Sequence, residues 1–315
     1  MRRKIYLVAL VLVCFAKISK GQIAIYDKNT LEEIKNGYTH IVVKDLDFPH
    51  ADEFLAVFKK YWTVTKGIDM IAASSLNTNL VAGDSYFSFD ANGLIPHGYG
   101  GGDGVGIYIK LWWPTEAALK NEKTNHHTYE FAHIKLSADI HLLHSDSFDQ
   151  KKFDFEFDGG GHVYHWNAGI LKNYIQMLVA QLELGKKINT GDQITDNNQL
   201  ALLKNQTLFC PVENFNRFFD LKGDFKAADA IKIFGDYRLK YQTISDQELG
   251  EKILHETAPF YYLLFIRDGD VKILSVINSE TGESIYLRSH ESSTMNTCNV
   301  KSADLKELFK AINKN

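Results

Sequence analysis

Two segments far apart in the chain share a residue pattern, and this repeat constrains the fold more than any other feature. Residues 51–62 (ADEFLAVFKKYW) resemble residues 228–238 (ADAIKIFGDYR) with one gap. Each copy continues with a predicted strand, a weakly helical stretch, strand-rich sequence and a closing helix. We therefore predict a tandem duplication, in which two similar units follow one another along the chain.

The strands of the two copies are predicted from alternating or continuous apolar runs between turn residues. Residues 63–65 and 239–244 are the strands that follow the repeated segment, and 68–80 and 246–256 are the weakly helical stretches. The strand-rich part of the first copy covers 85–91, 105–113, 129–140 and 152–158. The matching part of the second copy covers 260–267, 271–277 and 284–292.

Both copies end in a segment with helical apolar spacing. One stripe is formed by Leu171, Tyr174, Ile175 and Leu178, and the other by Leu305, Leu308, Phe309 and Ile312. Such a stripe packs one side of a helix against a sheet. The expected fold class is therefore α+β, with each unit an antiparallel sheet covered by helices.

These patterns divide the chain into five consecutive parts. A signal peptide is followed by an N-terminal extension with a short helix at 30–35 and a strand at 39–44. The first unit carries enlarged loops, and a polar segment connects it to the smaller second unit. The predicted bounds are 1–21 for the signal peptide, 22–48 for the N-terminal extension, 49–185 for the first unit, 186–223 for the connecting segment and 224–315 for the second unit.

The N-terminus has the organisation of a cleaved secretory signal. Arg2, Arg3 and Lys4 precede an apolar run at 5–16, which is shorter than the roughly 20 residues of a membrane-spanning helix. Cleavage before Gln22 would export the chain to the periplasm or the extracellular space. The Asn- and Lys-rich composition with only 5 prolines gives an impression of bacterial origin. No later segment has the length and apolar character of a transmembrane helix.

The net charge expected after cleavage narrows the range of possible partners. The predicted cleavage removes five basic residues and no acidic ones, so the net charge changes from −4 to −9. Nucleic acid and anionic lipid would repel such a chain and are not expected as partners.

Cys210 and Cys298 remain after cleavage. They could form a disulfide in an oxidising compartment or stay as two buried thiols, and both alternatives are open.

The first copy differs from the second mainly in two enlarged connections. Residues 90–104, which include a glycine-rich run, correspond to the short turn Asp268–Asp270, and residues 115–128 correspond to the turn at 279–282. Long insertions on a scaffold that closes without them are common places for binding sites. The glycine-rich run lacks the glycine spacing of a phosphate-binding loop. We therefore expect a flexible hairpin tip or a lid that contacts a ligand.

Eight of the 12 histidines lie between His97 and His165, close to the alternating segment FDFEFD at 153–158. Strand alternation places His133, Lys135, Asp139 and His141 opposite the apolar face formed by Ile134, Leu136 and Ala138. Histidine and carboxylate together suit zinc and similar ions, and the carboxylates alone suit calcium; the candidate ligands of either metal are His141, Asp154, Glu156 and His162. A solvated sheet face is the favoured alternative, because residues 133–141 spread over about 26 Å. No cofactor is implied.

Aromatic residues surround the enlarged connections and form the second set of candidates. They are Tyr99, Trp112, Trp113, Tyr164 and Trp166, although alternation sends only one of Trp112 and Trp113 inward. No serine nucleophile elbow or thiol-protease signature is present. The leading hypothesis is an exported, non-catalytic protein that binds a small ligand or a protein through the first unit. The alternative is an exported hydrolase, metal-dependent or using paired carboxylates, with its site in residues 97–166.

Overall fold

A computed structural model gives the fold of the chain. It describes residues 22–26, 29–78, 80–93, 105–120, 128–138, 157, 163–185, 193–218, 225–227, 230–268, 271–291 and 299–314. These residues form helices and two mixed β-sheets, so the chain has the expected α+β fold.

The first sheet has the strand order β1-β6-β5-β4-β2-β3, and β7 (Val163–Tyr164) continues the edge of β6 beyond β1. The elements before β7 are, in chain order, β1 (Ile23–Ile25), α1 (Thr30–Ile34), β2 (Thr39–Val43), α2 (Ala51–Tyr61), β3 (Ile68–Ala72), the 3-10 helix η1 (Ala73–Thr78), β4 (Ser85–Gly93), β5 (Val105–Pro114), α3 (Glu116–Leu119) and β6 (Thr128–Ala138). Helix α6 (Ala168–Glu183) follows β7 and closes the first unit.

The second sheet has the order β12-β9-β13-β14-β15-β8. Its elements are β8 (Ile194–Thr195), α7 (Asn197–Leu202), β9 (Leu208–Pro211), η3 (Val212–Phe215), the two-stranded β10 (Asn216–Phe218) and β11 (Phe225–Ala227), α8 (Ala230–Ile233), η4 (Phe234–Asp236), β12 (Tyr241–Ile244), α9 (Asp246–His255), β13 (Tyr261–Asp268), β14 (Val271–Asn278), β15 (Ser284–Glu291) and α10 (Ser302–Ile312).

The two sheets have the same connectivity. In the first, β2 runs parallel to β3 and β4, while β4, β5, β6 and β1 pair antiparallel. In the second, β9 runs parallel to β12 and β13, while β13, β14, β15 and β8 pair antiparallel. Corresponding strands also follow the same order along the chain. This correspondence supports a tandem duplication, which stays a prediction.

Several expected elements differ in detail from the structure. The sheets are mixed instead of purely antiparallel, because β2 and β9 enter them in parallel. Residues 68–80 form strand β3 and helix η1 instead of one weak helix, since β3 pairs with β2 along its whole length. The short helix and strand predicted at 30–35 and 39–44 are present as α1 and β2. The segments 22–48 and 186–223 contribute strands to the first and second sheet, respectively.

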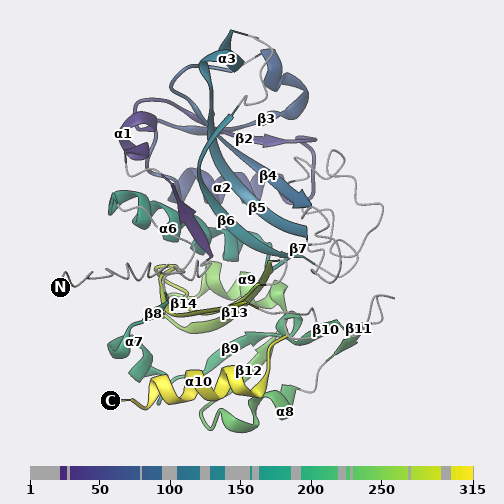
Figure 1. Cartoon of the computed structure of the whole chain (residues 1–315), viewed down its shortest axis with the longest axis vertical. Helices are drawn as coiled ribbons and strands as arrows, with labels where there is room; N and C mark the ends of the chain where they lie inside the picture. Colours follow the sequence, from purple (N-terminus) through teal and green to yellow (C-terminus); the bar gives the residue numbers. More distant parts are fainter. Residues whose placement is uncertain are drawn as a thin grey trace, which may run out of the picture.

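Helix α6 joins the two halves of the molecule. It packs against α2 and α9, and the largest hydrophobic cluster includes residues of α2, α6, α9 and both sheets. Figure 1 shows α6 and α9 between the first sheet at the top and the second sheet at the bottom. Helices α7, α8 and α10 cover the far side of the second sheet and form a second cluster with it. The second sheet is therefore buried on both faces.

The contact between α6 and α9 depends on two glycines. A Cβ added to Gly169 would lie 2.1 Å from the carbonyl oxygen of Gly250, and one added to Gly250 would lie 2.3 Å from Oδ1 of Asn167. Asn167 also caps α6, because its side chain accepts a 3.0 Å hydrogen bond from the Ile170 amide. The two helices can approach this closely only without side chains at the contact.

Replacing Gly169 with alanine is expected to destabilise the protein by about 1–3 kcal/mol, because the helices must separate to admit the methyl group. Gly235→Ala is the matched control, since a Cβ at Gly235 meets no atom within 4 Å. Urea unfolding of both variants measures the difference. Equal stability of the two variants would contradict the close helix contact.

A buried histidine fixes the junction between the units. His165 follows β7 with a left-handed φ of 58° and is 1% exposed. Asp246, the first residue of α9, accepts two hydrogen bonds from His165. His165 Nδ1 lies 2.6 Å from Asp246 Oδ1, and the His165 backbone N lies 2.8 Å from Asp246 Oδ2. Burial alone lowers the pKa of His165, but Asp246, together with Glu213 and Asn214, outweighs burial and raises it above 6.5. The protonated imidazole is therefore the form that the fold stabilises.

This interaction makes stability depend on pH. The contribution of protonated His165 is complete below its unfolded pKa of about 6.5 and is lost as the pH rises through the raised folded pKa. The stability advantage of the wild type over His165→Asn should therefore shrink as the pH is raised from about 6.5 into the alkaline range. Asparagine is chosen because it tolerates the left-handed backbone.

Guanidinium unfolding across this pH range tests the prediction. His255→Asn is the control, because the side chain of His255 is 73% exposed. We expect the difference between this variant and the wild type to be nearly constant with pH. An advantage over His165→Asn that grows with pH would contradict the raised pKa of His165.

Candidate functional site

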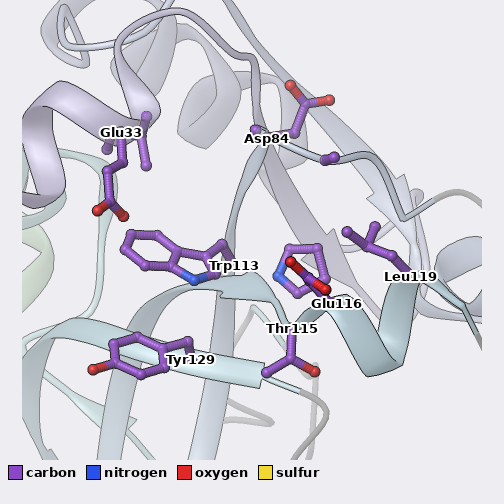
Figure 2. Close-up of a pocket in the computed structure, with 11 residues that line it drawn as sticks. Glu33, Asp84, Trp113, Thr115, Glu116, Leu119 and Tyr129 are labelled. Atoms are coloured by element: carbon purple, nitrogen blue, oxygen red, sulfur yellow. The ribbon is translucent and has the colours of Figure 1, made fainter. Parts of the chain in front are cut away.

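A cavity of about 360 Å³ opens at the end of the first sheet where β5 leads into β6 (Figure 2). We call it the Trp113 pocket. Its walls come from α1, the turn before β4, the end of β5, α3 and the start of β6. The lining residues are Glu33, Ile34, Ala82, Gly83, Asp84, Trp113, Pro114, Thr115, Glu116, Leu119 and Tyr129. The volume lies at the lower end of the range for small-molecule sites.

Two stacked aromatic rings form one side of the pocket. Trp113 and Tyr129 are direct cross-strand partners on β5 and β6, and their rings are 5.4 Å apart with an interplanar angle of 8°. Cross-strand aromatic pairs of this kind stabilise a sheet. Trp113 is half-buried and packs against the core, whereas Tyr129 is 51% exposed. The pair therefore presents an aromatic surface that the core holds in place.

Alternation separates the two neighbouring tryptophans, as expected from the sequence. Trp112 is buried on the opposite face, where it stacks on Tyr86 at 4.7 Å and donates a 2.9 Å hydrogen bond to Ser88 Oγ. Trp113 faces the core side and reaches the pocket. Of the four predicted aromatic ligand-binding residues that the structure describes, Trp113 is the one that lines the pocket.

The remaining predicted aromatic residues lie elsewhere. Trp166 packs among Phe54, Phe89 and Phe157, and its indole N–H donates to the Phe157 carbonyl at 2.7 Å. Tyr164 is half-buried in β7 beside His165. Tyr99 lies outside the described residues.

Three carboxylates surround the pocket, and its described lining residues include no basic one. Glu33 lies on α1 and Glu116 in the first turn of α3, where Thr115 caps the helix by accepting from the Ala118 amide. Glu116 is almost fully exposed and lies 3.4 Å from Lys120. Figure 2 shows the Glu33 carboxylate directed toward the indole of Trp113, with Glu116 on the other side of the pocket. The described lining residues therefore carry only negative formal charge.

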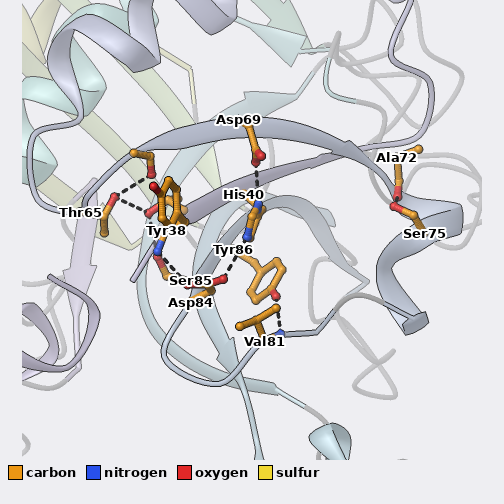
Figure 3. A network of polar contacts seen from close by, with 12 residues as sticks. Tyr38, His40, Thr65, Asp69, Ala72, Ser75, Val81, Asp84, Ser85 and Tyr86 are labelled. Carbon is orange, nitrogen blue, oxygen red and sulfur yellow. Dashed lines mark hydrogen bonds and ion pairs between the residues drawn. The ribbon is translucent and has the colours of Figure 1, made fainter. Parts of the chain in front are cut away.

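Asp84 belongs to the wall of the pocket and is held by a polar network (Figure 3). Its Oδ1 accepts a 2.7 Å hydrogen bond from the Tyr38 amide, and its Oδ2 lies 3.2 Å from His40 Nε2. The other nitrogen of His40 lies 2.5 Å from Asp69 Oδ1. In Figure 2 the Asp84 carboxylate points away from the aromatic pair. Asp84 therefore orders the wall instead of offering its carboxylate to a ligand.

Close backbone packing fixes the same wall. Gly83 has a φ of 87°, which is favourable for glycine and strained for most other residues. A Cβ at Gly37 would lie 2.0 Å from the Gly83 carbonyl oxygen. Tyr86 Oη accepts a 3.0 Å hydrogen bond from the Val81 amide. These contacts hold the turn before β4 against β2.

A second polar cluster lies on the outer face of the first sheet. Lys110 pairs with Asp90 and, at 3.5 Å, with Glu130, while His133 Nδ1 lies 2.7 Å from Glu130 Oε1. Burial alone raises the pKa of Glu130, but His133 and Lys110 outweigh it and lower that pKa below 4.5. His133 Nε2 is buried and has no hydrogen-bond partner among the residues that the structure describes.

The sequence predicted the direction of these side chains correctly but not their exposure, because His133 and Lys135 are buried instead of solvated. His133 and Lys135 point away from the core that contains Ile134 and Leu136, as the alternation predicted. Of the remaining predicted members, Asp139, His141, Asp154, Glu156 and His162 lie outside the described residues, so the metal-ligand prediction is not tested. Within the described ranges, no group of three or more His, Cys, Asp or Glu residues could hold a metal ion.

Cys210 is buried in β9, and burial raises the pKa of its thiol well above 9.0. It therefore stays protonated at neutral pH. Cys298 lies outside the described residues, so the alternative disulfide stays untested.

Among the helices that the structure describes, none is long and apolar enough to span a membrane.

Sequence reasoning found part of the Trp113 pocket. It singled out Trp113 and the enlarged connection at 115–128, which contains Glu116. It missed Tyr129, although this residue begins the next predicted strand. It also missed Glu33 and Asp84, which lie on segments with no local signal of a site.

Comparison with known protein families, curated proteins and solved structures finds no match for this chain.

Proposed function

We propose that this chain is an exported, non-catalytic binding protein that takes its ligand into the Trp113 pocket. The observation that carries the proposal is an open cavity of about 360 Å³ with a fixed aromatic side. Concave sites that combine aromatic surface with a few polar groups are the usual places for small ligands. Export rests on the signal peptide predicted at 1–21.

The second unit supports this assignment by contrast. Its β14–β15 connection is a tight turn in which Asn278 and Glu283 pair through their backbones and Gly282 has a φ of 72°. A Cβ at Gly282 would lie 2.4 Å from the Asn173 carbonyl oxygen on α6. That end of the second sheet is therefore used for packing, whereas the corresponding end of the first sheet is enlarged and open.

The chemistry of the lining favours binding over catalysis. The eleven residues contain no histidine, cysteine or lysine, and the Thr115 hydroxyl is used to cap α3. A nucleophile paired with a general base is therefore missing from these residues. The hydrolase alternative depends on residues of 97–166 outside the described ranges and stays a prediction.

A thermal-shift panel tests binding in this pocket. The probes are choline, N-acetylglucosamine and citrate, which represent a cation, a neutral sugar and an anion. At about 100 times its Kd, a ligand should raise the Tm of the wild type by about 4 °C, because it binds only the folded state. We expect at least one probe to do so and the shift to disappear in Trp113→Leu and Tyr129→Leu.

Tyr38→Leu is the matched control for Tyr129→Leu, because the two tyrosines are 52% and 51% exposed and Tyr38 does not line the pocket. It should keep the full shift. The proposal fails if no probe at millimolar concentration shifts the wild type, or if the shift survives in folded Trp113→Leu and Tyr129→Leu proteins.

A further inference from the structure

We infer that the ligand of the Trp113 pocket is a small organic cation, with an ammonium or guanidinium group held by the aromatic pair and the flanking carboxylates. This inference rests on the proposed function and specifies its ligand class. Four features of the described residues carry it: the sign of the charge, the unpaired state of Glu33, the aromatic surface and the size of the cavity.

The charged side chains among the described lining residues are all acidic. Glu33 and Glu116 flank the aromatic pair from two different helices, Lys120 lies beside Glu116 just outside the lining, and no lysine, arginine or histidine is among the described residues that line the cavity. An anionic ligand would be repelled by both carboxylates. If residues 1–21 are removed, the net charge of −9 also attracts cations over longer distances.

Glu33 is available to a ligand, in contrast to its neighbour. Glu32 forms an ion pair with Lys35 on the same helix. Within the described part of the chain, no hydrogen bond or ion pair is found for the Glu33 side chain, which points toward the indole. Glu33 is exposed and lines the pocket, so a ligand that binds beside it displaces part of the water around its carboxylate. A cation offsets that cost, whereas a neutral or apolar ligand leaves the charge without a partner.

The aromatic surface favours the same ligand class. Tryptophan is the side chain that attracts cations most strongly through its ring, and tyrosine also does so. Trp113 is held by its contacts with Tyr129 and with Phe131, whose ring is 5.1 Å away. A fixed indole beside a free carboxylate is an arrangement that recognises quaternary ammonium and alkylated lysine groups.

The cavity is small enough to select by size. About 360 Å³ accommodates a compact cation or one cationic side chain. The same ammonium chemistry can come from a free amine or from a lysine of a partner protein. Direct comparison of two cationic probes distinguishes these sources.

Calorimetric titration with choline and with its uncharged isostere 3,3-dimethylbutan-1-ol tests the inference. The two probes have nearly the same shape, so a difference between them reports the charge. We expect choline to bind at least tenfold more tightly, and its affinity to fall when NaCl is raised from about 0.05 M to 0.5 M. Equal binding of the two probes would overturn the cation inference.

Charge-neutral variants locate the interaction. Glu33→Gln should weaken choline binding about fivefold, and Glu116→Gln should weaken it in the same direction. Glu32→Gln is the matched control on the same helix with the same charge change, and it should leave the affinity unchanged. Equal effects of Glu32→Gln and Glu33→Gln would mean that only the overall field matters, which contradicts the assigned site.

Two substitutions of Trp113 test whether its aromatic ring is required for choline binding, provided that both variants fold. Trp113→Leu should lose choline binding, while Trp113→Phe retains a ring and should bind more weakly than the wild type by about tenfold. Circular dichroism and the Tm verify that both variants are folded. If a folded Trp113→Leu binds choline as tightly as the wild type, the ring plays no part and the inference fails.

Titration with two peptides tests whether the cation comes from a free amine or from a lysine of a partner protein. The probes are Ala-Lys-Ala with blocked ends and the same peptide with norleucine in place of lysine. Tighter binding of the lysine peptide than of choline indicates a protein ligand, and the reverse order indicates a free amine. Both orders support a cationic ligand, whereas equal affinity of the two peptides together with equal affinity of choline and its isostere overturns it.

The failure of this inference can be separated from the failure of the proposed function. If N-acetylglucosamine binds in a Trp113-dependent manner and choline does not, the pocket is a binding site but its ligand is not a cation. If none of the probes binds, both the function and the ligand class are wrong.

Discussion

Burial of helix α6 between two sheets is the constraint on which the rest of the structure depends. Twelve of its sixteen residues are buried, so it cannot be a surface helix with a single apolar stripe. Lys172 donates to the carbonyls of Ile253 and Ser279, and Asn173 bonds to Ser279 and Tyr262. The bonds of Lys172, and those of Asn173 to Ser279 and Tyr262, form only when the second unit is in place. The two units therefore depend on one another for burial.

The two sheets share one connectivity but differ in what their faces and ends do. The second sheet is apolar on both faces and ends in a turn packed on α6. The first sheet packs one face on the main core, while its other face carries a small buried cluster around Tyr86 and Trp112 beside the polar residues Lys110, Glu130 and His133. Its end carries the enlarged connection and the pocket. Comparison within one chain thus separates the parts required by the fold from the elaborations available for function.

The candidate site was predictable only where its signal was local. Trp113 was found because it is a large aromatic residue at a strand end beside an enlarged connection. Glu33 and Asp84 reach the pocket through the parallel pairing of β2 with β4, which brings α1 and the turn before β4 next to the end of β5. Local spacing carries no information about that pairing. An exposed glutamate on a short helix is otherwise an ordinary surface residue.

Local periodicity by itself determined which side chains of β6 face the core, where α6 and α10 carry their apolar stripes, and the order of elements in the two copies. These properties follow from backbone geometry, since side chains alternate along a strand and recur every 3.6 residues along a helix. The tertiary structure decided that β2 and β9 enter their sheets in parallel, that α6 is buried on two sides, and that Glu33 faces Trp113. Such outcomes depend on contacts between distant segments, whose partners are selected by the packing of the whole chain.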